Sequence, residues 1–396
     1  MTTRQVQLWY VAGPENKLVW MYAPVVDSLR LGFAPVAKVS VGLIGGRLGV
    51  STRSQAFLDR LETLKRGDAF IYIGIKPGHI KIPWYQLRSR GALTVFYETE
   101  PNALACSHKM PLSARADELW SYSHRVLEMC QSTYSVRRYV PPGHSSSTIA
   151  RPPGRAPYAK EWDGTSGEWV ASKRVDRSVL AVEGAATSGD LPKRGGGTEL
   201  LFLGYPFFKS RQPCYDKLQV ALGQRVNATW SVTSAAAFEA WWAEQGSHVV
   251  HLNLHKRGTS RTRLPGRSSV SVCSDAPTQA FEAFRAALLL SRGGLLISQR
   301  SDERDEAEFE GLVHFAAVDD MAALLPKLLQ RVRTRAQLRI AASYRERFEP
   351  RRLFARAGIY ERLLNGTVSG VHSAERTAVA PASRGTRPRA RHRPMI

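Results

Sequence analysis

The sequence predicts an α/β protein of two domains, each a parallel sheet with helices on both faces. Strand-like apolar runs alternate with amphipathic segments through residues 5–140 and again through residues 199–364. Alternation of this kind is typical of parallel strands that are connected by helices. The chain has 396 residues, which suits two ordinary domains better than one.

The first domain is expected to span residues 1–142. Its clearest strand is the continuous apolar run Asp68–Ile75, which is typical of a strand buried on both faces. Its clearest helix is Ser51–Lys65, whose apolar residues share one side. The other expected strands are Gln5–Ala12, Val36–Leu43, Ala92–Tyr97, Glu118–Tyr122 and Arg137–Val140, and the other expected helices are Lys17–Leu31, Ile82–Arg90 and Arg125–Gln131.

The second domain is expected to span residues 199–345. Its expected strands are Glu199–Leu203, Val226–Trp230, His248–Leu254, Gly294–Ser298 and Leu312–Ala317. Its expected helices are Cys214–Leu222, Ser234–Gln245, Thr278–Leu290 and a segment from Asp319 to Leu329, followed by the terminal helices Thr334–Phe348 and Arg351–Leu364. The acidic run Asp302–Asp305 is expected to be a solvated surface patch.

Three further segments complete the expected organisation. Residues 143–198 show little periodicity and contain clusters of Ser, Pro and Gly, which predicts a linker or insertion that is partly disordered. Residues 346–365 are expected to form a C-terminal helix that returns to the first domain. Residues 366–396, with six Arg and one Glu, are expected to be a disordered basic tail.

Charge and cysteine usage limit the class of protein. The net charge of +22 favours an anionic partner without choosing between nucleotide diphosphates, nucleic acid and anionic membrane. The four cysteines have no metal-site spacing, so we expect buried free thiols in a reducing compartment. The N-terminus lacks the pattern of a signal peptide and no apolar run is long enough to span a membrane, which predicts a cytoplasmic protein.

Several common enzyme motifs are absent from the sequence. It contains no GxGxxG, Walker A, GxSxG, HExxH or DxD motif. Domains of this type without a dinucleotide fingerprint point away from dehydrogenases and ATPases. The sequence thus offers no DxD motif for a bound metal, and we expect no metal or other cofactor.

Short segments occur in a characteristic order along the chain. They are Phe96–Glu100 (FYETE), Ala116–Ser123 (ADELWSYS), Arg138–His144 (RYVPPGH), Leu201–Tyr205 (LFLGY), His251–Arg257 (HLNLHKR), Phe281–Arg285 (FEAFR) and Gly293–Arg300 (GGLLISQR). This ordered set resembles GT-B glycosyltransferases over about residues 5–350, apart from the linker. The resemblance implies two Rossmann-like domains facing across a cleft, and transfer of a sugar from a nucleotide-sugar to an acceptor hydroxyl.

The second domain carries the residues expected to bind the donor. A diphosphate is bound by cations and backbone N–H groups, and a ribose by a carboxylate, beyond the carboxyl ends of parallel strands. The resemblance assigns the ribose contact to Glu282 and a phosphate contact to Arg211. The remaining donor-site candidates are Asn253, His255, Lys256, Arg257 and Arg285. Ordinary surface, capping or strand-end roles remain open for each of them.

The first domain carries the candidates for the general base. Glu98 and Glu100 follow a buried strand, so either carboxylate can deprotonate the acceptor if it faces the cleft, and His108 is a third candidate. The acceptor can be a glycan, a protein or a small molecule. The alternative to a transferase is a non-catalytic basic protein of the same fold that binds nucleic acid or another polyanion. A third hypothesis is an inactive transferase that keeps the fold but has lost catalysis.

Overall fold

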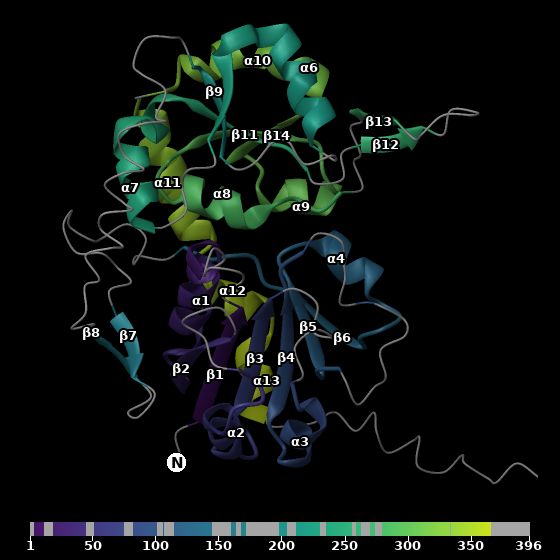
Figure 1. Ribbon diagram of the computed structural model, residues 1–396, viewed down its shortest axis with the longest axis vertical. Coiled ribbons are helices and arrows are strands. Elements are labelled where there is room, and N and C mark those ends of the chain that lie inside the picture. The colour runs from purple at the N-terminus through teal and green to yellow at the C-terminus, as the bar shows by residue number, and fades with distance from the viewer. Residues whose placement is uncertain are drawn as a thin grey trace, which may run out of the picture.

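The computed structural model confirms the predicted α/β class. It describes residues 4–11, 19–44, 51–74, 82–100, 106, 115–144, 160–163, 168–171, 198–203, 211–229, 235–255, 259–262, 270–273, 279–332 and 334–365. Within these residues the chain forms a six-stranded and a five-stranded sheet, each parallel throughout, and two small antiparallel hairpins. Figure 1 shows the two sheets in separate halves of the molecule.

The first sheet has the strand order β2-β1-β3-β4-β5-β6. Its strands are β1 (Arg4–Val11), β2 (Ala37–Ile44), β3 (Ala69–Gly74), β4 (Leu93–Glu98), β5 (Glu118–Ser121) and β6 (Val136–Tyr139). The helices between them are α1 (Val19–Phe33), α2 (Gln55–Glu62), α3 (Trp84–Ser89) and α4 (His124–Met129). Every residue of β3 is buried, as its apolar run predicts for a strand covered on both faces.

The second sheet has the strand order β10-β9-β11-β14-β15. Its strands are β9 (Leu200–Leu203), β10 (Val226–Thr229), β11 (Val250–Asn253), β14 (Leu295–Gln299) and β15 (Val313–Ala316). The accompanying helices are α6 (Gln212–Leu222), α7 (Ala235–Glu244), α8 (Ala283–Leu290), α9 (Glu303–Glu308), α10 (Val318–Leu329) and α11 (Arg335–Arg347), with 3-10 turns at Gly223–Arg225 and Gly246–His248.

The chain returns to the first domain at its C-terminal end. The expected single helix Arg351–Leu364 is instead two helices, α12 (Pro350–Arg356) and α13 (Ile359–Asn365). The break falls at Gly358, whose positive φ of 64° is accessible to glycine at little cost. Phe354 packs edge-on against Phe33 of α1, and the Tyr360 hydroxyl donates to the Gly32 carbonyl.

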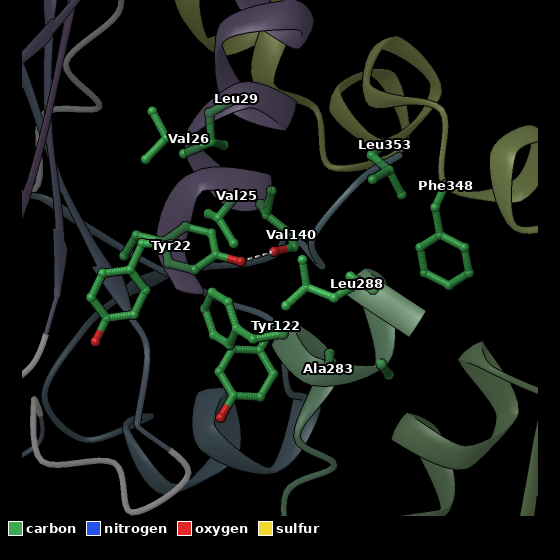
Figure 2. Packing of buried hydrophobic residues seen from close by; sticks show 14 of the residues in the cluster. Tyr22, Val25, Val26, Leu29, Tyr122, Val140, Ala283, Leu288, Phe348 and Leu353 are labelled. Atoms are coloured by element: carbon green, nitrogen blue, oxygen red, sulfur yellow. Dashed lines mark hydrogen bonds between the residues drawn. The ribbon is translucent and has the colours of Figure 1, made fainter. Parts of the chain in front are cut away.

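One buried apolar cluster continues from the first domain into the second. Figure 2 shows Val25 of α1, Val140 and Leu288 of α8 gathered in this cluster. The Tyr344 hydroxyl of α11 donates to the Pro142 carbonyl at 2.7 Å, and the Phe284 ring of α8 packs edge-on against Tyr122. The two domains are therefore in direct apolar contact through α1 and α8.

Two hairpins lie outside the predicted elements. Strands β7 (Lys160–Asp163) and β8 (Glu168–Ala171) pair within the segment expected to be a linker or insertion. Strands β12 (Thr259–Thr262) and β13 (Val270–Cys273) pair between β11 and α8. Each of these strands has only four residues, which is too short for a periodic pattern to reveal it in the sequence.

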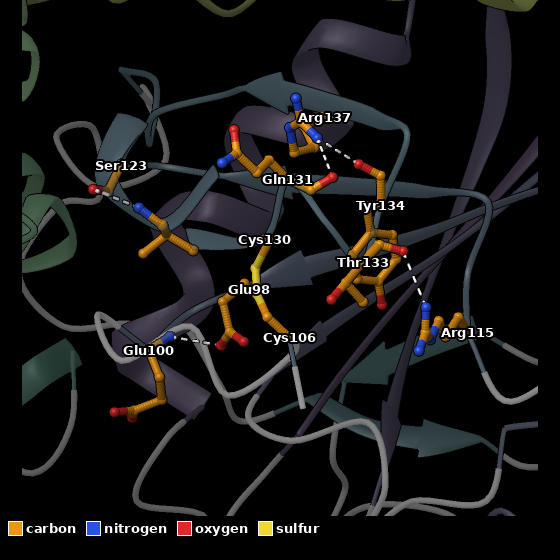
Figure 3. Close-up of a disulfide and its surroundings, with 11 residues drawn as sticks. Glu98, Glu100, Cys106, Arg115, Ser123, Cys130, Gln131, Thr133, Tyr134 and Arg137 are labelled. Carbon is orange, nitrogen blue, oxygen red and sulfur yellow. Dashed lines mark hydrogen bonds between the residues drawn. A yellow bond between two sulfur atoms is a disulfide. The ribbon is translucent and has the colours of Figure 1, made fainter. Parts of the chain in front are cut away.

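The expectation of free thiols is wrong. The structure pairs Cys106 with Cys130 and Cys214 with Cys273. The paired residues are 24 and 59 positions apart, with Cα–Cα distances of 5.0 and 4.6 Å. Figure 3 shows the first disulfide beside Glu98 at the end of β4. Because the partners are distant in the chain, sequence spacing gave no sign of either pairing.

Candidate functional site

The strand order gives the second sheet a topological switch point. Strand β9 lies between β10 and β11, so the chain leaves β9 towards one side of the sheet and later returns on its other side. In doubly wound sheets, ligands bind at such a switch point, beyond the carboxyl ends of the two central strands. The switch point of this sheet therefore lies after Leu203 of β9 and Asn253 of β11.

Arg211 reaches across this switch point. It precedes α6, which has Pro213 in its first turn, a position where the missing N–H of proline costs nothing. The Arg211 Nε donates to the Leu254 carbonyl, just after β11, at 3.0 Å. Its Nη2 donates to both carboxylate oxygens of Glu282, at 2.5 and 2.8 Å.

Glu282 lies between two arginines. It is the residue before α8, and its Oε2 is 3.2 Å from Nη2 of Arg285, one turn further along. Arg285 Nη1 donates to the Asn253 Oδ1 at 2.8 Å, and the amide of Asn253 donates in turn to Ser298 Oγ of β14. The structure thus brings together Arg211, Asn253, Glu282 and Arg285, four of the residues expected at the donor site.

The cluster has an excess of positive charge in a mostly buried setting. The side chains of Arg211, Glu282 and Arg285 are only 4%, 14% and 12% exposed. Both guanidinium groups lie over the Phe202 ring of β9, at 5.4 and 4.7 Å from its centroid. Burial lowers the pKa of Arg285 to about 10, although the Glu282 charge opposes this shift. Two guanidiniums share one carboxylate, so the cluster can accept an anion.

His255 lies at the same edge with one ring nitrogen bonded. Its Nε2 faces the carbonyls of Gln299 and Arg300, each at 3.1 Å. Burial lowers the pKa of His255, so the ring is neutral and Nε2 carries the proton that the carbonyls accept. The Nδ1 is then an acceptor, and it is buried without a hydrogen-bond partner among the residues that the structure describes.

Three expected site residues fall outside the described part of the chain. They are His108, Lys256 and Arg257. The expected convergence of Lys256 and Arg257 with Glu282 stays a prediction.

The expected base residues lie at the carboxyl end of the first sheet. Glu98 ends β4 and is fully buried, whereas Glu100 is partly exposed. The backbone N–H of Glu100 donates to Glu98 Oε1 at 2.9 Å, as Figure 3 shows. Burial raises the pKa of Tyr122, and the charges of Glu282, Glu100, Glu98 and Asp305 raise it further. The charges of carboxylates from both domains thus act on this one phenol.

Asp305 is a functional candidate that the sequence did not indicate. The acidic run around it was expected to be solvated, but it forms α9, with Asp302 capping the helix and Asp305 only 1% exposed. Its carboxylate contacts residues of both domains. No local pattern marks this position, because two of its three hydrogen-bond donors belong to the other domain.

The described residues contain no group of three His, Cys, Asp or Glu side chains able to hold a metal ion. No helix among them is long and apolar enough to cross a membrane. An open depression of about 710 Å³ lies between β15 and the outer face of α10, lined among others by Arg300, Phe315 and Lys327. It does not include the arginine cluster, and its lining lacks a buried charged group aimed into it.

Comparisons with known proteins find likenesses of structure alone. No family model and no curated sequence matches the chain. A lipopolysaccharide outer core galactosyltransferase, WaaB, is 13% identical, with 90% of this chain and 99% of that one covered and a TM-score of 0.41. An α-glucosyltransferase solved with UDP and a 13-mer DNA is 9% identical (92% and 100% covered, TM-score 0.40), and S. aureus MnaA with UDP is 8% identical (92% and 98% covered, TM-score 0.39).

The chain has a GT-B-like fold. This conclusion rests on the strand orders and contacts of the chain itself. The chain has two parallel sheets, and residues beyond the carboxyl end of the first sheet touch residues beyond the carboxyl end of the second.

Proposed function

We propose that this protein is a glycosyltransferase that moves a sugar from a nucleotide-sugar to an acceptor hydroxyl without a bound metal. The observation that carries the proposal is the cluster of Arg211, Glu282 and Arg285 at the switch point of the second sheet. A nucleoside diphosphate combines an anion with vicinal hydroxyls, and the cluster offers cations beside a carboxylate.

The proposed chemistry divides between the domains. Arg211 and Arg285 stabilise the negative charge of the departing diphosphate as the bond between sugar and phosphate breaks, which is the task a metal ion performs in other enzymes. The Glu282 carboxylate accepts from the ribose hydroxyls, and His255 Nδ1 is available to a further donor group of the ligand.

The proposed acceptor is activated by a carboxylate of the first domain. Glu100 fits this role better than Glu98, because a base must reach the hydroxyl it deprotonates and Glu98 is fully buried. His108 remains a candidate for the same role. The proton moves from the acceptor hydroxyl to the base as the oxygen forms its bond to the anomeric carbon.

A thermal-shift screen tests the proposal. The probes are inorganic pyrophosphate, the diphosphates of adenosine, cytidine, guanosine, uridine and thymidine, and sugar conjugates of any that bind. A ligand of the native state raises Tm by mass action, so at least one nucleoside diphosphate is expected to exceed pyrophosphate. If none does, and a DNA or RNA oligonucleotide binds with a steep salt dependence instead, the protein is a polyanion binder.

A further inference from the structure

Asp305 of α9 is a buried carboxylate with three hydrogen-bond donors. Its Oδ2 accepts from the Ser123 hydroxyl at 2.6 Å and from the Phe281 backbone N–H at 3.1 Å, and its Oδ1 accepts from the His124 N–H at 2.7 Å. Bonds to a charged acceptor are about twice as strong as neutral ones. A site that commits three donors to one carboxylate therefore holds their positions firmly.

The three donors belong to different domains. Ser123 and His124 form the N-terminus of α4 in the first domain, where Ser123 caps the helix. Phe281 belongs to the second domain and directly precedes Glu282, whose backbone begins α8. Asp305 thus connects the end of the first sheet to the residue next to the carboxylate that pairs with Arg211.

We propose that Asp305 is a positioning residue that couples the contact between the two domains to the orientation of Glu282. The inference rests on the proposed nucleotide site. A shift of the first domain moves the Ser123 and His124 donors, Asp305 follows them, and the Phe281 N–H and the adjoining Glu282 follow Asp305. Nucleotide affinity then depends on the domain contact, although Asp305 is not itself a ligand-binding group.

Protonation supplies a readout of this contact. Burial raises the pKa of Asp305 to about 6, against the opposing effect of its three hydrogen bonds. An exposed Asp has a pKa near 3.9, so Asp305 binds a proton more readily when the contact between the domains buries it. The contact between the domains is therefore favoured at acid pH. The contact between the domains weakens as the pH rises from about 4 through about 6. The other titratable or charged groups around it are His124, Tyr122, Tyr139, Glu308 and Arg356.

The test compares Ser123→Ala with two matched controls. Ser54→Ala removes the equivalent N-cap bond of α2, far from the contact, and Glu128→Gln breaks the exposed ion pair with Arg304 that also joins the domains. The probes are UDP, or whichever nucleoside diphosphate the screen identifies, its 2′,3′-dideoxy analogue, and pyrophosphate. Ser123→Ala is expected to weaken binding of the natural nucleotide by up to about tenfold, because the coupling cannot exceed the free energy of the lost bond to a buried charge.

The pattern over the probes separates positioning from simple loss of stability. In Ser123→Ala we expect a smaller preference for the natural nucleotide over its dideoxy analogue and unchanged binding of pyrophosphate. Ser123→Thr keeps a hydroxyl at this position, so we expect it to show the wild-type preference. The difference in nucleotide affinity between the wild type and Asp305→Asn changes between pH 4 and 7, because only the wild type has a titrating carboxyl group at position 305. Equal nucleotide affinities for Ser123→Ala and Ser54→Ala would overturn the proposal.

Amide hydrogen exchange tests the coupling even if no nucleotide binds. Failure to bind any nucleoside diphosphate would refute the proposed function, but Ser123→Ala would still speed exchange at both His124 and Phe281 if Asp305 couples them. Faster exchange at His124 alone would show that the domains are not coupled through Asp305.

Discussion

The substitution Glu282→Gln tests the site most directly. Glutamine keeps the shape of the side chain but removes the charge that both Arg211 and Arg285 contact. Removing one partner of a buried ion pair costs about 3–5 kcal/mol of folding free energy, and the low end applies because the glutamine oxygen still accepts one bond. Nucleotide binding should weaken by about 1.5–3 kcal/mol, roughly 10- to 150-fold, through loss of a charged acceptor for the ribose hydroxyls.

Isothermal titration with three ligands checks the assignment. The natural nucleotide should bind Glu282→Gln more weakly, whereas its 2′,3′-dideoxy analogue should bind both proteins alike. Pyrophosphate should bind the variant equally or more tightly, because the guanidiniums are less neutralised. The control is Glu199→Gln, which breaks an exposed pair with Arg225 and should cost under about 1 kcal/mol of stability. If all three ligands weaken equally, Glu282 is not the ribose contact.

Three further expectations concern stability. Glu118→Ala should lower the free energy of unfolding by about 3–5 kcal/mol in urea titrations, because this buried carboxylate pairs with Arg362 and with a second arginine; Arg362→Ala alone should cost less. Burial lowers the pKa of His251 to about 4, so its contribution is complete above about pH 6.5 and disappears as the pH falls to about 4; thermal melts of His251→Gln should lack this dependence. Replacing Cys214 and Cys273 by serine should lower the free energy of unfolding by about 2–4 kcal/mol. A reductant should therefore lower the Tm of the wild type more than the Tm of this double variant, which has already lost the disulfide.

The local elements could be predicted from the sequence because their causes are local. The apolar run at β3 and the shared face of α2 encode a buried strand and an amphipathic helix whatever else the chain does. The four-residue hairpin strands, the break at Gly358 and the short helix α9 were missed because short elements show too little periodicity.

The candidate site was predictable as a set of residue types but not as a geometry. Arg211 and Glu282 are 71 residues apart, and only the strand order brings them to the same edge. Sequence reasoning assigned one to phosphate and the other to ribose, and did not foresee that they bind each other. The pairing follows from burial, since a desolvated charge needs a partner.

The sequence by itself determined the α/β class, the course of most strands and helices, and the residue types available for anion binding. These depend on periodicity and on the chemistry of single side chains. Only the tertiary structure decided that the arginines share Glu282, that the cysteines pair, and that Asp305 is buried, 182 positions from Ser123. Burial and charge pairing are properties of surfaces that meet in space, and a carboxylate in a polar run looks the same in the sequence whether or not another domain covers it.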